Sequence, residues 1–230
     1  MDWQTVIDFD KQLLLWFNGS PSLFLDIVVH TLTTALTWLP FYLSLFYLVM
    51  KNNDSVQKIL FVLAAAGLCV LIAGTIDDAI VKPTVARWRP THDPQIGLLV
   101  DIVDGYRGGR YGFFSAHASN TFSIAIFFWW LVRSRLLTTA MVIWSLTNCW
   151  TRLYLGVHFP GDILVGLLWG GITGSFVYWL FLRVTRHIRT NMTFTSTKYT
   201  KTGYLRSDID VPVSVLIFTL IYALIRASFG

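Results

Sequence analysis

Long apolar runs without Asp, Lys or Arg dominate the pattern of this chain. A helix that crosses the hydrocarbon core of a bilayer, about 30 Å thick, needs about 20 mostly apolar residues. The runs that approach or reach this length are Ile27–Met50, Ile59–Ile76, Ala118–Val132, Leu136–Trp150, Ile163–Leu182 and Val211–Ile225. Backbone groups within lipid must be hydrogen-bonded inside their own segment, so each run is expected to be a helix. The pattern predicts an all-α integral membrane bundle of five or six transmembrane helices.

Residues 1–20 show a different pattern. Apolar side chains between Trp3 and Phe17 alternate with Asp and Gln at near-helical spacing, which is typical of a helix lying in the membrane interface. We therefore expect an interfacial N-terminal helix over residues 1–20, followed by a membrane domain over residues 21–189. Within the first apolar run, Pro40 predicts a kink.

Basic residues are concentrated in the turns on one side of the predicted bundle. They are Lys51, Lys58, Arg133, Arg135, Arg183, Arg186 and Arg189. Because Lys and Arg in short loops are retained in the cytoplasm, this side is expected to be cytoplasmic. Residues 190–210 are then a cytoplasmic linker, and residues 211–230 contain the last transmembrane helix. The loop that begins at Asp77 and the turn Thr151–Asp162 lie on the opposite side.

The composition supports a membrane protein. Hydrophobic residues make up 54% of the chain and charged residues only 13%, against roughly 25% charged in an average soluble domain. The net charge of +5 is spread between apolar spans, whereas a nucleic-acid partner requires basic residues clustered on a soluble face. We expect a lipid bilayer around the chain, no nucleic-acid partner and no obligate protein partner. Cys69 and Cys149 lie in apolar runs without a CxxC pair and are interpreted as free thiols.

Three groups of polar residues lie at span ends on the non-cytoplasmic side. They are Lys82 with Arg89, then Ser115 to His117, and then Arg152 with His158 and Asp162. Arg offers a planar fork to phosphate oxygens, and Lys adds a compact positive charge. Ser115 and Ala116 stand where a helix is expected to begin, so their backbone N–H groups are unpaired donors suited to an anion. The combination predicts a phosphate pocket.

A nucleophile and an acid can be assigned within these groups. Pro160 suits the first position of a helix, so Asp162 lies in the first turn and can reach back to His158. A carboxylate on one imidazole nitrogen fixes the tautomer and leaves the other nitrogen free to attack phosphorus. His117 is then expected to protonate the leaving oxygen. The sequence shows no group of Asp and His at metal-ligand spacing, so no metal and no other cofactor are expected.

Other basic side chains near the span ends have a simpler interpretation. A single cationic or imidazole side chain beside a span is usually an anchor at the interface. On this basis Arg87, Arg107, Arg110, His30 and His92 are interpreted as interface anchors, and Asp77 and Asp78 as residues that end a helix.

The three groups also resemble known motifs. KPTVARWRP at Lys82–Pro90 resembles the K-x6-R-P motif of the type 2 phosphatidic acid phosphatase family. FSAH at Phe114–His117 resembles its P-S-G-H motif, and TRLYLGVHFPGD at Thr151–Asp162 resembles its S-R-x5-H-x3-D motif. The order and spacing agree over about residues 77–182, with catalytic loops at 77–117 and 151–162.

This resemblance implies a membrane lipid phosphatase that works without a metal. It implies that His158 is the nucleophile and forms a phosphohistidine, that Asp162 orients it, and that His117 is the general acid. The residues that it implies for phosphate binding are Lys82, Arg89, Ser115, Ala116 and Arg152. Phe114, Ala116 and Thr151 replace the Pro, Gly and Ser of the family's motifs. The replacement at Ala116 matters most, because Gly adopts a positive φ at little cost and Ala does not.

The chain is similar to bacterial undecaprenyl-diphosphate phosphatases and lipid A phosphatases of this family. The resemblance implies a multi-pass protein of the bacterial inner membrane whose active site faces the periplasm. Undecaprenyl diphosphate is the expected substrate, because Arg107 and Arg110 on the Gly-rich rim could hold a second phosphate. The alternatives are a lipid A phosphatase and a phosphotransferase that uses the same site. A vanadate haloperoxidase and an anion channel are less consistent with the spans and with the His and Asp residues.

Overall fold

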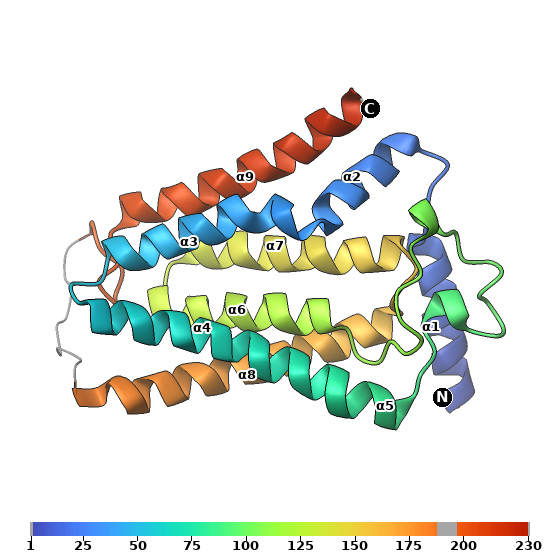
Figure 1. Ribbon diagram of the computed structural model, residues 1–230, viewed down its shortest axis with the longest axis horizontal. Helices are drawn as coiled ribbons and strands as arrows, with labels where there is room; N and C mark the ends of the chain where they lie inside the picture. Colours follow the sequence, from blue (N-terminus) through green and yellow to red (C-terminus); the bar gives the residue numbers. More distant parts are fainter. Residues whose placement is uncertain (1, 188–196, 230) are drawn as a thin grey trace.

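The computed structural model describes residues 2–187 and 197–229, and the regular secondary structure of this part of the chain is helical, as predicted. The helices are α1 (Trp3–Phe17), α2 (Leu23–Thr33), α3 (Leu39–Lys51), α4 (Val56–Ile76), α5 (Lys82–Val85), α6 (Ala116–Val132), α7 (Arg135–Tyr154), α8 (Pro160–Val184) and α9 (Arg206–Ser228). Figure 1 shows the long helices running alongside one another, while α1 lies across one end of the bundle.

Length and composition identify several of these helices as candidate membrane spans. Within the described residues, Val56–Val85, Pro160–His187 and Arg206–Ser228 are long and apolar enough to cross a bilayer. A fourth span results if α2 and the helical stretch Ala35–Lys51 are counted together, although they are bent by 68°. Helix α6, with 17 residues, and helix α7 do not belong to this set. Three or four of the five or six predicted spans are therefore supported in this way.

The bend in the first span does not lie at Pro40. Helix α2 ends at Thr33, and Thr34 adopts an extended conformation before the short 3-10 turn Ala35–Trp38. Pro40 lies in the first turn of α3. A backbone N–H at this position would have no acceptor within the helix, so its absence in proline costs no hydrogen bond. The predicted kink is thus wrong in its position, since the chain already bends before the proline.

Helix α4 ends with the apolar run at Ile76, but the helical stretch continues beyond it. A π-helical turn at Asp77–Val81 joins α4 to α5, so the helical stretch reaches Val85. Ala86, in the left-handed conformation with a φ of 49°, ends it. The prediction of a loop from Asp77 is therefore wrong for its first part, and Lys82 is held on a helix.

Helices α6 and α8 are packed closely through a row of glycines. Gly166, Gly170 and Gly174 recur at every fourth position of α8 and face the backbone carbonyls of Ser115, Ser119 and Ser123 on α6. A Cβ atom at Gly170 would lie only 2.6 Å from the carbonyl oxygen of Ser119. Small residues at this spacing let two helix backbones approach within a membrane. We call these three residues the glycine face of α8.

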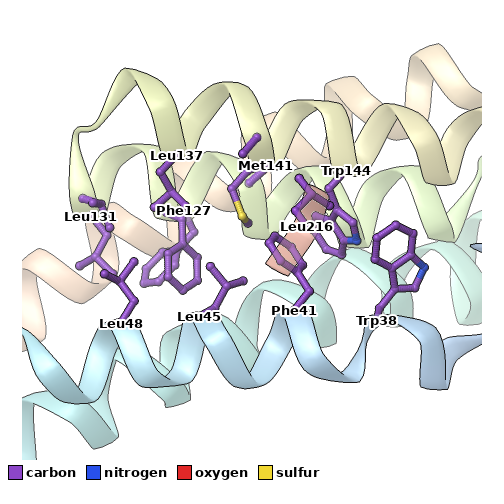
Figure 2. Packing of buried hydrophobic residues seen from close by; sticks show 14 of the residues in the cluster. Trp38, Phe41, Leu45, Leu48, Phe127, Leu131, Leu137, Met141, Trp144 and Leu216 are labelled. Atoms are coloured by element: carbon purple, nitrogen blue, oxygen red, sulfur yellow. The ribbon is translucent and has the colours of Figure 1, made fainter. Parts of the chain in front are cut away.

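A hydrophobic core fills the space between α3, α6, α7 and α9. Figure 2 shows its side chains, among them Trp38, Phe41, Leu45, Leu48, Phe127, Leu131, Leu137, Met141, Trp144 and Leu216. Trp144 is fully buried, and the rings of Trp38 and Tyr42 meet it edge to face at centroid distances of 6.2 and 5.7 Å. Such pairs add to the stability gained from burial, so this core holds α6 and α7 in a fixed arrangement.

The predicted cytoplasmic linker at 190–210 is partly described. Its residues 190–196 lie outside the described residues. The segment before α9 packs on the ends of neighbouring helices: Thr202 Oγ1 donates to the carbonyl of Val132 at 2.8 Å, and the N–H of Leu205 donates to Asn52 Oδ1 at 2.6 Å. Helix α9 begins at Arg206, before the predicted Val211, so the described part of the linker is a docked turn followed by helix.

The two ends of the bundle carry different sets of charged and polar residues. Figure 1 shows the ends of α3, α6 and α8 together with the starts of α4, α7 and α9 at its left. These ends carry the predicted basic residues from Lys51 to Arg186, whereas Arg189 lies outside the described residues. Helices α1 and α5 and the starts of α6 and α8 lie at the opposite end. The basic turn residues used to predict orientation and the candidate chemical groups are therefore at opposite ends, in agreement with the predicted alternation.

Candidate active site

The three polar groups predicted from the sequence meet at the end of the bundle that α1 crosses. Lys82 comes from α5, Arg89 from the loop that follows it, and Arg152 from the end of α7. All three lie within electrostatic range of His158, and His117 lies in the same field. The structure thus brings together two imidazoles and three cations from segments far apart in the chain.

His158 is the buried centre of this arrangement. Its side chain is only 2% exposed, and its Nε2 lies 3.1 Å from Arg89 Nη1. Because Arg can only donate, Nε2 must be the accepting nitrogen and Nδ1 must carry the proton. Burial lowers the pKa of His158 well below its ordinary value, and the nearby charges of Arg89 and Lys82 lower it further. A neutral imidazole with its lone pair on Nε2 is the form required of a nucleophile.

Arg89 is fixed by the loop around it. Its Nε donates to the carbonyl of Tyr111 and its Nη1 to the carbonyl of Val157, both at 3.1 Å. A Cβ atom at Gly112 would lie 2.9 Å from Arg89 Cγ, so only glycine lets the loop pass this closely. Nη2 has no acceptor among residues 2–187 and 197–229, and is available to a phosphate oxygen.

Asp162 lies in the first turn of α8, as expected, but its contact with His158 differs from the prediction. The distance from Asp162 Oδ2 to His158 Nδ1 is 3.7 Å, which is too long for a hydrogen bond. Oδ2 instead accepts from the N–H of Phe159 at 2.9 Å, and Oδ1 accepts from Arg87 Nη1 at 2.7 Å. The buried carboxylate therefore lies close to the His158 ring without a direct hydrogen bond to it.

Arg87 is a part of the site that the sequence interpretation missed. Its two terminal nitrogens bind two carboxylates, Asp162 at 2.7 Å and Asp10 of α1 at 2.6 Å. Its guanidinium also lies 4.2 Å above the ring of Phe159. The interpretation of Arg87 as an interface anchor is therefore wrong. Its position two residues before Arg89 was the available signal, whereas nothing in the sequence pointed to Asp10.

Arg152 is almost completely buried, with 2% of the residue exposed. Its Nη2 donates to the hydroxyl of Thr33 at 2.7 Å and to that of Thr151 at 3.2 Å. Thr151 takes the place of the family's serine, and its hydroxyl performs this holding role. Thr33 at the end of α2 was not predicted, because it lies far from the motifs in the sequence.

Lys82 is paired with two carboxylates. Its Nζ lies 2.8 Å from Asp77 Oδ2 and 2.6 Å from Asp78 Oδ1. The Asp77 side chain is fully buried, whereas that of Asp78 is 65% exposed. These aspartates therefore do more than end a helix: they hold the ammonium group at the site.

The start of α6 provides donors, but not all of those predicted. The hydroxyl of Ser115 caps the helix by accepting from the N–H of Ala118 at 3.5 Å, and its own N–H donates to the carbonyl of Asp162 at 3.1 Å. The N–H of Ser115 is thus not free for phosphate, which corrects the prediction. Ala116 is not among the described residues with positive φ, so the replacement of Gly costs no strain. The amides of Ala116 and His117 remain as first-turn donors.

Arg107 and Arg110 lie exposed on the rim formed by residues 86–115. The guanidinium of Arg110 stacks on Trp88 at 4.4 Å from the ring centroid, and the backbone of Arg107 accepts from Thr91 Oγ1 at 2.9 Å. Trp88 and Tyr111 form an antiparallel bridge that closes this rim at its base. The rim therefore presents two cations above the pocket.

Comparisons with known proteins agree with the motifs. A family model described as the PAP2 superfamily matches residues 58–186. The chain is 40% identical to a lipid A 4'-phosphatase of Bacteroides thetaiotaomicron over 185 residues, which are 80% of this chain and 82% of the relative. It is 36% identical to a lipid A 4'-phosphatase of Porphyromonas gingivalis over 180 residues, or 77% and 75% of the two chains.

A more distant relative is a decaprenylphosphoryl-5-phosphoribose phosphatase of Mycobacterium tuberculosis, 32% identical over 112 residues, or 49% of this chain and 57% of the relative. No solved structure matches the chain. The family model begins within α4 and ends within the 3-10 turn that follows α8, so α1, α2, α3 and α9 lie outside it.

Proposed function

The chain belongs to the PAP2 superfamily and is a membrane lipid phosphatase, and we propose that it removes a phosphate monoester from lipid A. The observation that carries this proposal is the identity of 40% and 36% to two lipid A 4'-phosphatases over about four fifths of the chain. The relative whose name indicates a polyprenyl lipid matches only half of the chain. The comparisons therefore favour lipid A over undecaprenyl diphosphate, the substrate expected from the rim arginines.

In the first step of the proposed reaction, the phosphate enters among Lys82, Arg89 and Arg152. Arg89 leaves His158 for a phosphate oxygen, which frees Nε2 to attack phosphorus. The bond from phosphorus to the lipid oxygen breaks, its electron pair stays on that oxygen, and His117 in its protonated form supplies the proton. Desolvation and the cations Arg152, Arg89 and Lys82 lower the pKa of His117 to about 3, and the negative charge of a phosphate held among these cations raises it again, so that the imidazole is protonated together with substrate binding. The product is a phosphohistidine, and the alcohol of the lipid departs.

In the second step, water attacks the phosphohistidine while His117 accepts its proton. The bond from phosphorus to Nε2 of His158 breaks, its electron pair returns to the ring, and inorganic phosphate leaves. The negative charge of Asp162, 3.7 Å from Nδ1, stabilises the positive imidazole ring of the intermediate. If an alcohol replaced water, the same site would be a phosphotransferase, and inorganic phosphate would not be released.

The substrate assignment is tested by assaying two lipids side by side with the purified protein. We expect lipid A to lose one phosphate, which is released as inorganic phosphate. Its kcat/KM should be at least about tenfold above that for undecaprenyl diphosphate, which corresponds to about 1.4 kcal/mol of stronger transition-state binding. A preference for undecaprenyl diphosphate that disappears in the double variant Arg107→Ala and Arg110→Ala would reverse the assignment. Transfer of phosphate to an added alcohol without free phosphate would establish the transferase instead.

Catalysis is expected to need no divalent metal. Lys82, Arg89 and Arg152 already supply the positive charge that a metal would bring to the phosphoryl oxygens. EDTA should leave the rate unchanged, and orthovanadate should inhibit more strongly than phosphate, because its five-coordinate form resembles the transferring phosphoryl group. Loss of activity in EDTA that Mg²⁺ restores would contradict this expectation.

We also propose that the protein lies in the bacterial inner membrane with the site facing the periplasm. The basic residues at the opposite end of the bundle support this orientation. In a background with Cys69 and Cys149 replaced, Leu98→Cys, at a fully exposed position of the rim, should react with a membrane-impermeant thiol reagent in intact spheroplasts. Asp54→Cys, in the turn between α3 and α4, should react only after lysis. The opposite labelling would place the site in the cytoplasm.

A further inference from the structure

A chain of ion pairs joins the N-terminal helix to the candidate active site. Asp10 of α1 binds Arg87 Nη2 at 2.6 Å, and Arg87 Nη1 binds Asp162 of α8 at 2.7 Å. The side chains of Asp10 and Arg87 are 15% and 25% exposed, whereas that of Asp162 is not exposed at all. One cation is thus shared between a carboxylate of the reaction site and a carboxylate outside it.

The second oxygen of Asp10 contacts the turn that carries Asp162. Asp10 Oδ1 accepts from the backbone N–H of Gly161 at 2.8 Å. A Cβ atom at Gly161 would lie 2.9 Å from Asp10 Oδ2, so the absence of a side chain there permits the approach. A carboxylate at the start of a helix is also favoured by the helix dipole. Asp10 therefore touches both the counter-ion of Asp162 and the backbone that holds it.

We propose that Asp10 is a positioning residue for the reaction, acting on Asp162 through Arg87 and Gly161. This inference rests on the proposed phosphohistidine chemistry. Asp10 lies on α1, outside the residues 58–186 that match the family model. The N-terminal helix is then part of the catalytic apparatus and not only a membrane attachment.

The physical role of Asp10 follows from the geometry of Arg87. While Asp10 holds Nη2, Arg87 can give only Nη1 to Asp162, and Oδ2 of Asp162 stays directed to Phe159 and His158. Without Asp10, the planar fork of Arg87 is free to turn and bind both carboxylate oxygens. Oδ2 would then be drawn away from Nδ1 of His158. The carboxylate charge would then lie further from the ring, and its electrostatic stabilisation of the phosphohistidine would be weaker.

Helix α1 has other contacts that hold it in place. Lys11 pairs with Asp93 at 3.0 Å, and Asn18 Nδ2 donates to the carbonyl of Tyr154 at 2.8 Å. Loss of the Asp10 carboxylate is therefore not expected to detach α1. Its effect should fall on the chemical step, because Asp10 contacts none of the phosphate-binding cations Lys82, Arg89 and Arg152.

The test compares Asp10→Asn with the parent on a soluble phosphate monoester and on the lipid. We expect kcat to fall about tenfold to a hundredfold, the range produced by a misplacement of about 1 Å in a catalytic group, with KM within about twofold. In Asp10→Glu, which retains the charge, the decrease in log kcat should be at most half of that in Asp10→Asn. Asp8→Asn is the matched control: it removes the same charge from the same helix, where Asp8 is exposed and bonded to Gln4.

A second measurement asks whether Asp10 acts through Arg87. In an Arg87→Ala background, Asp10→Asn should cause no further loss, since residues that act as one unit are not additive. The inference would be overturned if the losses of activity caused by Arg87→Ala and Asp10→Asn multiplied in the double variant. It would also be overturned if Asp10→Asn changed only KM, or if its kcat equalled that of Asp8→Asn. Asp10→Ser is a second neutral variant, and failure of both neutral variants to fold would assign Asp10 to folding alone. A parent protein that cleaves no phosphate ester would instead reject the proposed function.

Discussion

Replacing His158 by alanine is expected to lower the turnover of the lipid phosphate by about 10⁶-fold, the loss measured for removing the nucleophile of another hydrolase, subtilisin. His158 is a buried group within the electrostatic range of Lys82, Arg89 and Arg152. Its Nε2 lies 3.1 Å from Arg89 Nη1 and is the nitrogen that the proposed mechanism frees for attack. The variant should still fold, because Asp162 keeps its bonds to Arg87 and to the N–H of Phe159.

The measurement is direct. Parent and variant are mixed with a ³²P-labelled substrate and quenched in alkali, where a phosphohistidine survives, and only the parent should carry label. His92→Ala provides the control, since His92 is a rim histidine bonded to the neighbouring Thr91 at 3.1 Å. Residual turnover within about tenfold of the parent would remove His158 from the role of nucleophile.

Replacing His117 by alanine is expected to slow release of the lipid alcohol by about 10²–10⁴-fold. An alkoxide is a poor leaving group unless it is protonated, and the proposed mechanism takes the proton from His117, which is exposed at the start of α6. With para-nitrophenyl phosphate, whose phenolate departs without a proton, the first step should be nearly unaffected.

The two substrates thus separate the acid role from a loss of structure. In the para-nitrophenyl phosphate reaction, the His117→Ala variant should show a burst of phenolate and an accumulating phosphohistidine, because water lacks its base. His30→Ala, an exposed histidine of α2, should behave like the parent on both substrates. Equal losses on the two substrates without a burst would contradict the assignment of His117 as acid and base.

The sequence predicts helices and the meeting of the motif residues well, because both follow from patterns within short segments. Apolar runs identify the helices, and motifs at alternate span ends must lie on one side of a membrane. The same criterion stops at the first charged residue, so it located the end of α4 at Ile76 but missed the helical continuation to Val85. Asp77 and Asp78 continue the helix because Lys82 neutralises them one turn later, at 2.8 and 2.6 Å.

The bend between α2 and α3 could not be located from the proline alone. Hydroxyl groups before Pro40 bond backbone carbonyls, with Thr34 Oγ1 donating to His30 and Thr37 Oγ1 to Thr31 at 2.9 and 2.7 Å. Threonines that bond the preceding turn in this way often bend helices. Their effect depends on which rotamer each adopts, and packing decides that.

Long-range ion pairs were also beyond the sequence. Spacing places Asp162 one turn from His158, but it does not determine which neighbour takes the carboxylate. Arg87 takes it, and the other partner of Arg87, Asp10, is 77 positions away. A single basic residue beside a span carries no sign of a distant carboxylate, so an anchor was the natural interpretation.

The glycine face of α8 makes the α6–α8 pair a rigid part of the molecule, in contrast to the loop that forms the rim. Helices α6 and α8 carry His117 and Asp162, and backbone contact along Gly166, Gly170 and Gly174 prevents either helix from sliding or rotating against the other. A bulky headgroup must therefore be admitted by the rim at 86–115, which belongs to neither helix. Changes of substrate preference during evolution should accumulate in that rim, while the relative position of His117 and Asp162 stays fixed by the two helices.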